Sequence, residues 1–271
     1  MSIDVRCVIP HYGGGAGPWV IDDLCLIDEG MLEIDVIDSN PPNPRRLFTE
    51  AVNVGVKKAC RNRVIWILNN DTRIAYPQHA FDAALKVFDD DPHAGIVGSC
   101  MVRMDDPDLI HWGGSGQCWP AGRHKTGRIS NGDLQERTEE EWVTFASVFI
   151  RADVFREIGM LDKNLRHICS DADFCLRARE AGWKCFYEPK SIVRHACGSS
   201  SGTSDPWLRN VMQQDVEHFT RKWITPADRF NALTQYKVGV RYEEPHRLLL
   251  RVDDQSRGPV DRWMERAHQS C

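Results

Sequence analysis

The 271-residue chain is predicted to fold as an α/β protein with a mainly parallel, doubly wound sheet and a small second sheet. Segments with strand-like and helix-like patterns alternate over residues 5–101, and this order is typical of parallel sheets. Residues 63–68 form a continuous apolar run, as expected for a strand that is covered on both faces. A hydrophobic content of 42% and a charged content of 27% suit one large core or two small ones.

Four strands and three helices are expected in the first hundred residues. Residues 5–10 form a β-branched run that a proline ends, and residues 33–38 alternate as a strand does. Residues 47–60 place apolar side chains on one helical side, and a proline opens the helix expected at 77–88. The remaining elements are a helix at 19–27 and strands at 63–68 and 95–101.

Polar residues follow three of these strands. Ligands of a doubly wound sheet bind beyond the carboxyl ends of its strands, so we expect His11, Asp38 and residues 69–71 along one edge. The glycine-rich residues 11–17 lack the Lys-Ser/Thr pair of a P-loop and the spacing of a dinucleotide fingerprint. They are interpreted as a turn that lets a ligand approach the backbone.

The second half has a less regular pattern. Residues 111–132 are rich in Gly, Trp, Arg and His, and they are expected to form a long functional loop rather than a core element. Residues 170–181 are expected to form a helix with Ser170 as its N-cap. The other expected elements are strands at 142–150, 184–187 and 192–194, helices at 153–158 and 206–223, and a Gly/Ser loop at 196–204.

Composition limits the class of protein. Lys and Arg number 34 and Asp and Glu number 39, and the net charge of −5 argues against a broad nucleic-acid surface. Ten cysteines occur without a Cys-x-x-Cys pair and without a signal-peptide pattern, so most are interpreted as reduced, packed thiols. No apolar run is long enough to cross a bilayer. We therefore expect a soluble, cytoplasmic protein, with peripheral attachment to a membrane surface as an alternative.

Asn69, Asn70 and Asp71 directly follow a predicted buried strand. A carboxylate at the exposed end of a strand suits a hard divalent cation, which takes oxygen ligands and keeps positions open for phosphate. The alternative interpretation is that Asp71 only caps the following turn.

Asp171 is expected in the first turn of the helix at 170–181. The helix dipole there favours an ionised carboxyl, which could accept a proton from an incoming hydroxyl; capping is the alternative. Asp173 lies four residues before Arg177, and an ion pair explains that spacing without chemistry.

His195 closes the strand expected at 192–194. A neutral imidazole there can bind a metal, and the following glycines and serines can form a lid with amides facing phosphate. The alternative interpretation is that His195 is a surface or core histidine whose hydrogen bonds are satisfied locally and which binds no metal.

The order and spacing of these pieces resemble an inverting family 2 glycosyltransferase of the GT-A fold, over roughly residues 3–223. Residues 8–10 and 36–40 resemble the first two strands of that family, and residues 53–55 with 67–72 resemble the helix and strand that lead into its metal motif. The strongest stretch runs from 149 to 195 and includes Ile158-Gly159-Met160-Leu161-Asp162, Ser170-Asp171-Ala172-Asp173-Phe174-Cys175-Leu176-Arg177, Ala181-Gly182 and Val193-Arg194-His195; Lys222-Trp223 fits the closing helix.

The resemblance implies roles for these residues. Asp71 and His195 would hold Mn²⁺ or Mg²⁺, which neutralises the diphosphate leaving group. Asp38 would accept the base N–H of a uridine- or thymidine-type donor, with UDP as the first expectation. Asp171 would be the general base for an attack that inverts the anomeric carbon without an enzyme nucleophile. The implied donor-binding residues are Pro10, His11, Tyr12, Asp38, Asn69, Asn70 and Asp71, and the implied acceptor contacts are Trp112, Gly113, Gly114 and Ser170.

The chain departs from the family pattern at two positions. Asn69 stands at the usual first acidic position of the metal motif, which leaves one carboxylate there. Ser170 stands at the usual Glu before the catalytic Asp, and this change would alter hydrogen bonding to the acceptor.

Two rival functions are weighed against this one. A catalytically dead GT-A domain would bind nucleotide or sugar without donor hydrolysis, and the two departures motivate it. A sugar-nucleotide nucleotidylyltransferase would need a basic phosphate loop after the first strand, but residues 13–17 contain no Lys or Arg.

The acceptor stays open among a glycan, a glycolipid, a protein and a modified base. A basic patch of Arg123, His124, Lys125 and Arg128 would suit nucleic acid, whereas a solvated loop is the alternative. Trp112 and Trp119 would either stack on a sugar or base or pack in the core.

The expected domain organisation is one catalytic domain over 1–225, with a nucleotide-binding half to about residue 101, an acceptor half from 102, and a polar extension over 226–271. The donor sugar and the oligomeric state stay open.

Overall fold

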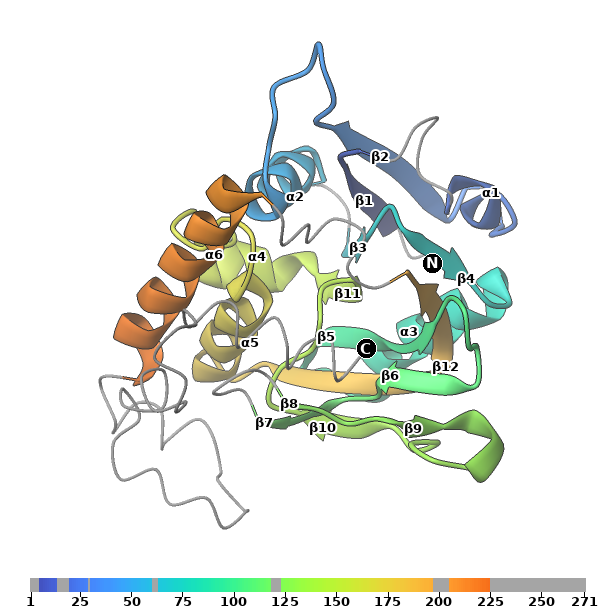
Figure 1. Cartoon of the computed structure of the whole chain (residues 1–271). Helices are drawn as coiled ribbons and strands as arrows, with labels where there is room; N and C mark the ends of the chain where they lie inside the picture. The colour runs from blue at the N-terminus through green and yellow to red at the C-terminus, as the bar shows by residue number, and fades with distance from the viewer. Residues whose placement is uncertain are drawn as a thin grey trace.

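A computed structural model describes residues 5–13, 20–28, 30–59, 63–117, 123–196 and 205–224. Its main feature is a ten-stranded sheet with the strand order β10-β12-β5-β11-β3-β1-β2, and β4, β6 and β9 pair off this path (Figure 1). β7 (Ser115–Gln117) and β8 (Arg123–His124) form a separate two-stranded sheet. The predicted α/β class with a mostly parallel sheet is confirmed.

β11 breaks the parallel order in the middle of the sheet, and the short strands at its margins also pair antiparallel. β1 pairs in parallel with β2 and β3, and β5 pairs in parallel with β12, whereas β11 (Ser147–Arg151) lies antiparallel between β3 and β5. The sequence predicts this strand but not its place, because an apolar run has the same pattern whichever way its neighbours run. The parallel strands are β1 (Val5–His11), β2 (Leu32–Asp38), β3 (Val64–Leu68), β5 (Ala94–Arg103) and β12 (Lys184–His195).

Shorter strands extend the sheet around β5 and β12. β4 (Thr72–Ile74) and β10 (Thr138–Glu140) pair with β12, β6 (Leu109–Trp112) pairs with β5, and β9 (Gly127–Arg128) pairs with β6. The prediction of one long loop over 111–132 is wrong, because the end of β6 is a core element. The two short strands predicted at 184–187 and 192–194 are parts of one strand, with a register shift between Glu188 and Ile192.

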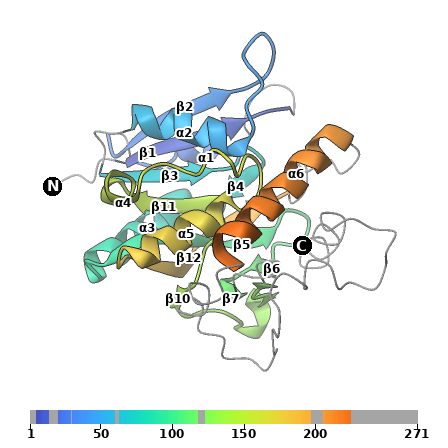
Figure 2. The ribbon, with the colours of Figure 1, turned by 90° about the vertical axis from the view of Figure 1, so that its left-hand side faces the viewer.

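Helices cover both faces of the sheet (Figure 1). α2 packs on one face of β1, where Gly55 lies so close to Val8 that a Cβ would collide with it. α3 packs on the other face of the sheet, where the ring centroids of Phe81 of α3 and Trp66 of β3 lie 6.0 Å apart. Figure 2 shows α4, α5 and α6 over the strands. The helices are α1 (Ile21–Leu24), α2 (Phe48–Lys58), α3 (Pro77–Asp90), α4 (Ala152–Ile158), α5 (Ser170–Glu180), α6 (Pro206–Phe219), the 3-10 turn η1 (Ile129–Asn131) and the π turn η2 (Thr220–Ile224).

The start of α5 differs from the prediction. Cys169 is the N-cap, with a left-handed φ of 64°, and no side chain caps the helix. Ser170 is already helical and buried, so its predicted capping role is wrong. The predicted pair of Asp173 and Arg177 is present, with 2.9 Å between Oδ2 and Nε.

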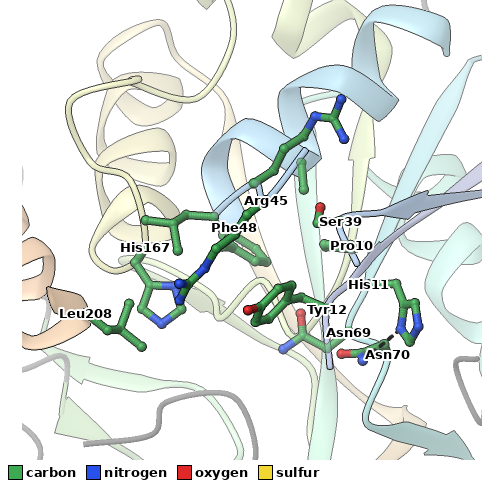
Figure 3. A pocket seen from close by; sticks show the side chains of 13 residues that line it. Pro10, His11, Tyr12, Ser39, Arg45, Phe48, Asn69, Asn70, His167 and Leu208 are labelled. Atoms are coloured by element: carbon green, nitrogen blue, oxygen red, sulfur yellow. Dashed lines mark hydrogen bonds between the residues drawn. The ribbon is translucent and has the colours of Figure 1, made fainter. Parts of the chain in front are cut away.

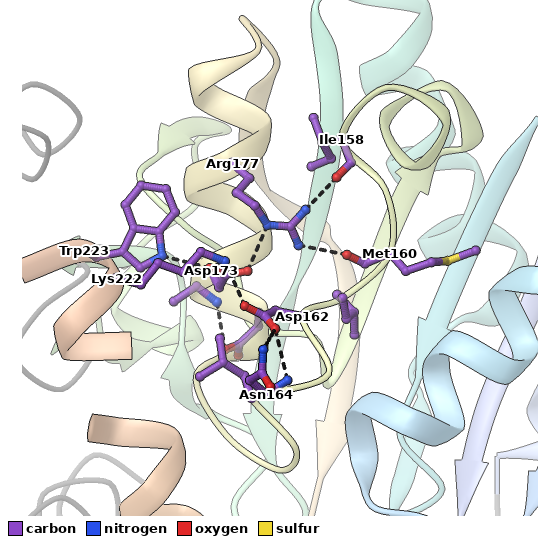
Figure 4. Close-up of polar contacts among 12 residues, drawn as sticks. Ile158, Met160, Asp162, Asn164, Asp173, Arg177, Lys222 and Trp223 are labelled. Atoms are coloured by element: carbon purple, nitrogen blue, oxygen red, sulfur yellow. Dashed lines mark hydrogen bonds and ion pairs between the residues drawn. The ribbon is translucent and has the colours of Figure 1, made fainter. Parts of the chain in front are cut away.

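A buried polar network ties α5 to its surroundings (Figure 4). Asp173 has no exposed surface, and its Oδ1 atom lies 2.8 Å from Trp223 Nε1 and 2.6 Å from Lys222 Nζ. Arg177 also donates to the carbonyl oxygens of Ile158 and Met160, at 2.8 and 2.9 Å. The network therefore joins α5 both to the end of α4 and to η2.

The predicted basic patch has acidic partners. Lys125 pairs with the buried Glu140 at 2.6 Å, and Arg128 lies 2.9 Å from an oxygen of Asp108. These partners compensate the two charges, which disfavours a nucleic-acid surface there. The Arg123 side chain and Trp119 lie outside the described residues.

Most of the described thiols are packed side chains, as the composition predicts. Cys7, Cys100, Cys175 and Cys185 are buried and free, as predicted, while Cys25 is exposed and free. Within the described ranges, no helix combines the length and the apolar character that a membrane span needs. The tail 226–271 and most of the 196–204 loop lie outside the described residues.

Candidate active site

The ends of β3 and β12 meet at one edge of the sheet. Asp71 follows β3, and β4 then pairs with β12 so that Thr72 lies opposite His195. The Oδ1 atom of Asp71 lies 3.3 Å from Nε2 of His195, and these side chains are only 9% and 14% exposed. The fold thus brings together two residues that the sequence singles out separately.

The ends of β1 and β2 continue this edge. The Nδ2 atom of Asn70 lies 3.1 Å from Nδ1 of the buried His11. Strand pairing sets His11 opposite Asp38, and the Ser39 N–H donates to the His11 carbonyl at 2.9 Å. The expected alignment of polar residues along the strand ends is therefore present.

Asp38 is an exposed carboxylate held by its own loop. It accepts hydrogen bonds from the backbone N–H and side-chain amide of Asn40, at 2.9 and 2.8 Å, and from Asn43 Nδ2 at 3.1 Å. The Asn40 backbone and side-chain bonds lower the pKa of Asp38. Asp38 is thus an oriented anionic acceptor.

A pocket of about 610 Å³, counting the part open to solvent, lies beside these strand ends (Figure 3). Five predicted donor-binding residues line it, namely Pro10, His11, Tyr12, Asn69 and Asn70. Asp38 and Asp71 are not among the lining residues, although Ser39 and Asn70, which adjoin them, are. The sequence interpretation missed the rest of the wall, which consists of Ser39, Arg45, Arg46, Leu47, Phe48, Ala51, His167 and Leu208.

Arg45 joins the two sides of this pocket. Its guanidinium carbon lies 5.1 Å from the ring centroid of Tyr12 and 4.5 Å from that of Trp207. Asp205, the N-cap of α6, lies 3.5 Å from Arg45 Nη2. A positive charge therefore lies in the wall between the end of β1 and the start of α6, where it favours an anionic ligand.

Asp171 lies in the first turn of α5, half-buried, with its Oδ1 atom 2.8 Å from the Ala172 N–H. Burial raises the pKa of Asp171 to about 6, although backbone donors at Ala172 and Phe145 oppose the rise. The amides at the helix start favour the ionised form, as expected, but burial outweighs them. A carboxyl with this pKa is still mostly ionised at neutral pH and is a stronger base than an exposed Asp.

Two adjacent residues before β11 connect Asp171 to the strand ends. The backbone of Phe145 is hydrogen-bonded to the Asp171 carboxyl, and the carbonyl of Ala146 accepts the Asn69 N–H at 2.9 Å. Asp171 and the Asn69–Asp71 turn therefore border the same short segment.

The residues expected to contact an acceptor are buried. Trp112 has no exposed surface and packs edge-on against Tyr187, with ring centroids 5.8 Å apart, so the packing alternative holds for it. Gly113 and Gly114 are also buried, and a Cβ on them would meet Leu134 and Glu140 respectively. With Ser170 buried as well, none of the four presents a side chain to a ligand in this conformation.

His111 is a residue that the sequence interpretation missed. It is buried at β6, and its ring lies against that of His195, with centroids 5.6 Å apart and 26° between the planes. No sequence signal marks it, because only the pairing of β6 with β5 brings a histidine of this glycine-rich segment to the end of β12.

The side chains at this edge fit a divalent cation whose remaining coordination positions are filled by phosphate oxygens of a ligand. Among the described residues, no group of three His, Cys, Asp or Glu side chains could hold a metal ion. Asp71 and His195 supply one carboxylate and one imidazole side by side. Mg²⁺ and Mn²⁺ commonly take one or two protein groups together with phosphate oxygens, and this pair suits that arrangement.

Two solved glycosyltransferases share this fold. GalNAc-T7 in a structure with UDP, GalNAc and Mn²⁺ has a TM-score of 0.56 and 14% identity, over 82% of this chain and 48% of that one. The mannosyltransferase PcManGT from Pyrobaculum calidifontis, in complex with GDP-Man and Mn²⁺, has a TM-score of 0.54 and 15% identity, over 80% of this chain and 63% of that one. The fold is thus that of the GT-A glycosyltransferases.

The chain belongs to the family described as glycosyltransferase like family 2, whose model matches residues 36–212. Among curated proteins, "Uncharacterized protein y4gI" from Sinorhizobium fredii (strain NBRC 101917 / NGR234) is 24% identical over an alignment of 226 residues, and the match covers 75% of this chain. The chain spans about a quarter of the length of that relative, 24%.

Proposed function

We propose that the protein is a metal-dependent inverting glycosyltransferase, which moves a sugar from a nucleoside diphosphate to an acceptor hydroxyl. The observation that carries this proposal is that Asp71 and His195 lie side by side at the strand ends. The turn that holds Asp71 and the carboxyl of Asp171 both contact the segment 145–146. Family membership and the fold support a transferase.

The donor is expected in the pocket beside β1 and β2. Asp38 is oriented to accept a nucleobase N–H, and Arg45 and Arg46 supply positive charge for an anionic ligand. UDP is the first donor nucleotide to test. The two neighbours were solved with UDP and with GDP-Man, which supports a nucleoside diphosphate without deciding its base.

Asp71 and His195 would hold the cation. When bound, Mn²⁺ or Mg²⁺ would neutralise the charge that develops on the diphosphate as it leaves. The neighbours solved with Mn²⁺ support a divalent metal. The chain's own contribution is to keep the carboxylate and the imidazole adjacent and largely out of water.

Asp171 would act as the general base. Its carboxylate would take the proton from the acceptor hydroxyl while the oxygen attacks the anomeric carbon opposite the leaving diphosphate. The bond to the diphosphate breaks as the new glycosidic bond forms, so the configuration inverts. No enzyme nucleophile is needed, which is consistent with buried thiols at Cys175 and Cys185.

The domain boundaries, the acceptor class and the cellular location remain the expectations stated from the sequence. Gly113 and Gly114 would contact an acceptor only if the surrounding segment opened, and the same holds for Trp112 and Ser170.

A panel of nucleotide sugars tests this function. Purified protein with Mn²⁺ should release nucleoside diphosphate from at least one donor, and EDTA should abolish that release. Asp71→Asn and His195→Ala should also lose it, while Asp153→Asn, at an exposed position of α4, should keep it. Nucleotide binding without release from any donor, even with an acceptor mixture present, would favour a catalytically dead GT-A domain.

A further inference from the structure

α6 reaches from the pocket wall to the loop before α5. Leu208, near its start, lines the pocket, and Asp215 lies two turns further along. The Asp215 carboxylate has no exposed surface and accepts the backbone N–H groups of Arg166 at 2.9 Å, His167 at 2.7 Å and Ile168 at 3.0 Å.

These three bonds fix the path of residues 166–168. Hydrogen bonds from N–H groups to a carboxylate are stronger than those to neutral acceptors, and a buried carboxylate that lost them would be costly. Burial raises the pKa of Asp215, although the three backbone donors oppose the rise. On the other side of the loop, the Arg166 carbonyl accepts the Thr49 N–H at 3.1 Å, so the loop is held between α6 and α2.

The middle residue of this loop belongs to the pocket wall. Figure 3 shows His167 beside Arg45 and Leu208. Burial, with a contribution from the Arg45 charge, lowers the pKa of His167 to about 4, so the ring is neutral at neutral pH.

Two polar atoms of the wall, His167 Nδ1 and Ser39 Oγ, are buried without a hydrogen-bond partner among the described residues. Buried polar atoms are usually paired, so two such atoms in one wall indicate a ligand or ordered water that pairs with them.

We propose that His167 contacts the ligand of this pocket through a hydrogen bond and that Asp215 is the residue that positions it. The ligand is the nucleoside diphosphate of the proposed function, and the inference rests on that function to this extent. Asp215 touches no ligand itself: it acts through the backbone of residues 166–168.

A double-mutant cycle on nucleotide affinity tests the proposal. Isothermal titration with UDP, GDP, ADP and dTDP in Mn²⁺ is run on wild type, His167→Ala, Asp215→Asn and the double variant. We expect each single substitution to reduce the affinity for the nucleotide that wild type binds best by about three- to tenfold, the effect of one lost hydrogen bond. The double variant should bind this nucleotide as well as the weaker-binding single variant does, because Asp215 acts through His167.

A matched control separates positioning from loss of stability. Val216 is buried beside Asp215 on α6, so Val216→Ala should lower the melting temperature while it keeps the three N–H bonds and the nucleotide affinity. Hydrogen exchange of the amides at 166–168 should become faster in Asp215→Asn and stay slow in Val216→Ala.

The outcomes distinguish this inference from the proposed function. If wild type binds a nucleotide and His167→Ala binds it equally well, the inference is wrong and the proposed function stands. Additive effects in the double variant, or unchanged exchange at 166–168 in Asp215→Asn, would overturn the positioning role. If wild type binds none of the four nucleotides, both the function and the inference fail.

Discussion

At the scale of single residues, Asp171 combines a catalytic assignment with a cost in stability. Its pKa is about 6 in the folded protein, and its ordinary value in the unfolded chain is 3.8. The folded state therefore holds this proton more tightly, so the ionised carboxyl lowers stability fully above about pH 6 and ceases to do so below about pH 4.

Asp171→Asn should therefore lose transfer, keep nucleotide binding and melt a few degrees higher than wild type at pH 8. The difference in melting temperature should vanish by pH 4. Thermal unfolding at the two pH values checks this, with Asp153→Asn as the control that should show no difference. A variant with near-normal turnover would exclude Asp171 as the base.

His167 should show the opposite pH dependence. Its pKa is lowered from 6.5 to about 4, so the unfolded chain takes up the proton first as the pH falls. The contribution of His167 to stability is thus unchanged above about pH 6.5 and is progressively lost between pH 6.5 and 4. The melting temperature of His167→Gln should therefore fall less steeply with decreasing pH than that of wild type over this interval. An unchanged slope of melting temperature against pH would contradict the lowered pKa of His167.

The residues that sequence reasoning placed correctly are those at strand ends. His11, Asn70 and Asp71 were within reach because strand order predicts which carboxyl ends meet, whereas the pairing of Asp71 with His195 was implied by the family resemblance. The positions of Arg45, His111 and His167 at the site could not be predicted. Loops place Arg45 and His167 there and the pairing of β6 places His111 there, and neither kind of segment has a periodic sequence pattern. The raised pKa of Asp171 could not be predicted, because burial is a property of the packed structure.

At the scale of elements, α5 is linked to η2 through the buried carboxylate of Asp173. Asp173→Asn would leave Arg177 and Lys222 next to a neutral amide with no exposed surface, and we expect a loss of about 3–5 kcal/mol in unfolding free energy. Trp223→Phe removes one N–H donor and part of a fully buried ring, and should cost less, about 1–3 kcal/mol. Urea unfolding of the two variants measures the difference, and equal losses would contradict this account.

The contact of α2 with β1 makes a second prediction at this scale. Gly55→Ala places a methyl group against Val8, and overpacking of this kind costs about 1–3 kcal/mol. Lys57→Ala, at an exposed position of the same helix, is the control and should change unfolding free energy by less than about 0.5 kcal/mol. Equal stability of the two variants would show that β1 and α2 can separate at little cost.

Elements with a clear period were predicted within a few residues of their bounds, as α2, α3, β2 and β3 show. The strands of the 109–128 region were missed because they are short and lie among glycines, and their pairing with β5 forms them. Tertiary contact decides such segments, and local pattern does not.

At the scale of the whole molecule, the proposed metal site makes stability depend on ligands. Mn²⁺ together with the donor nucleotide should raise the melting temperature of wild type by several degrees at concentrations well above the Kd. His195→Ala should lose the part of this rise that requires Mn²⁺ and retain the part due to nucleotide alone. A Mn²⁺-dependent rise that persists in this variant would place the cation elsewhere.

The position of β11 has a consequence for how the protein is synthesised. Residues 5–103 contain β1 to β5, yet β3 and β5 cannot be joined until residues 147–151 leave the ribosome and enter between them. The nascent sheet therefore has two open facing edges during this interval, which is the kind of surface that pairs with other chains. A fragment that ends near residue 101 should accordingly aggregate, and the order of synthesis makes the second half of the chain a requirement for a soluble first half.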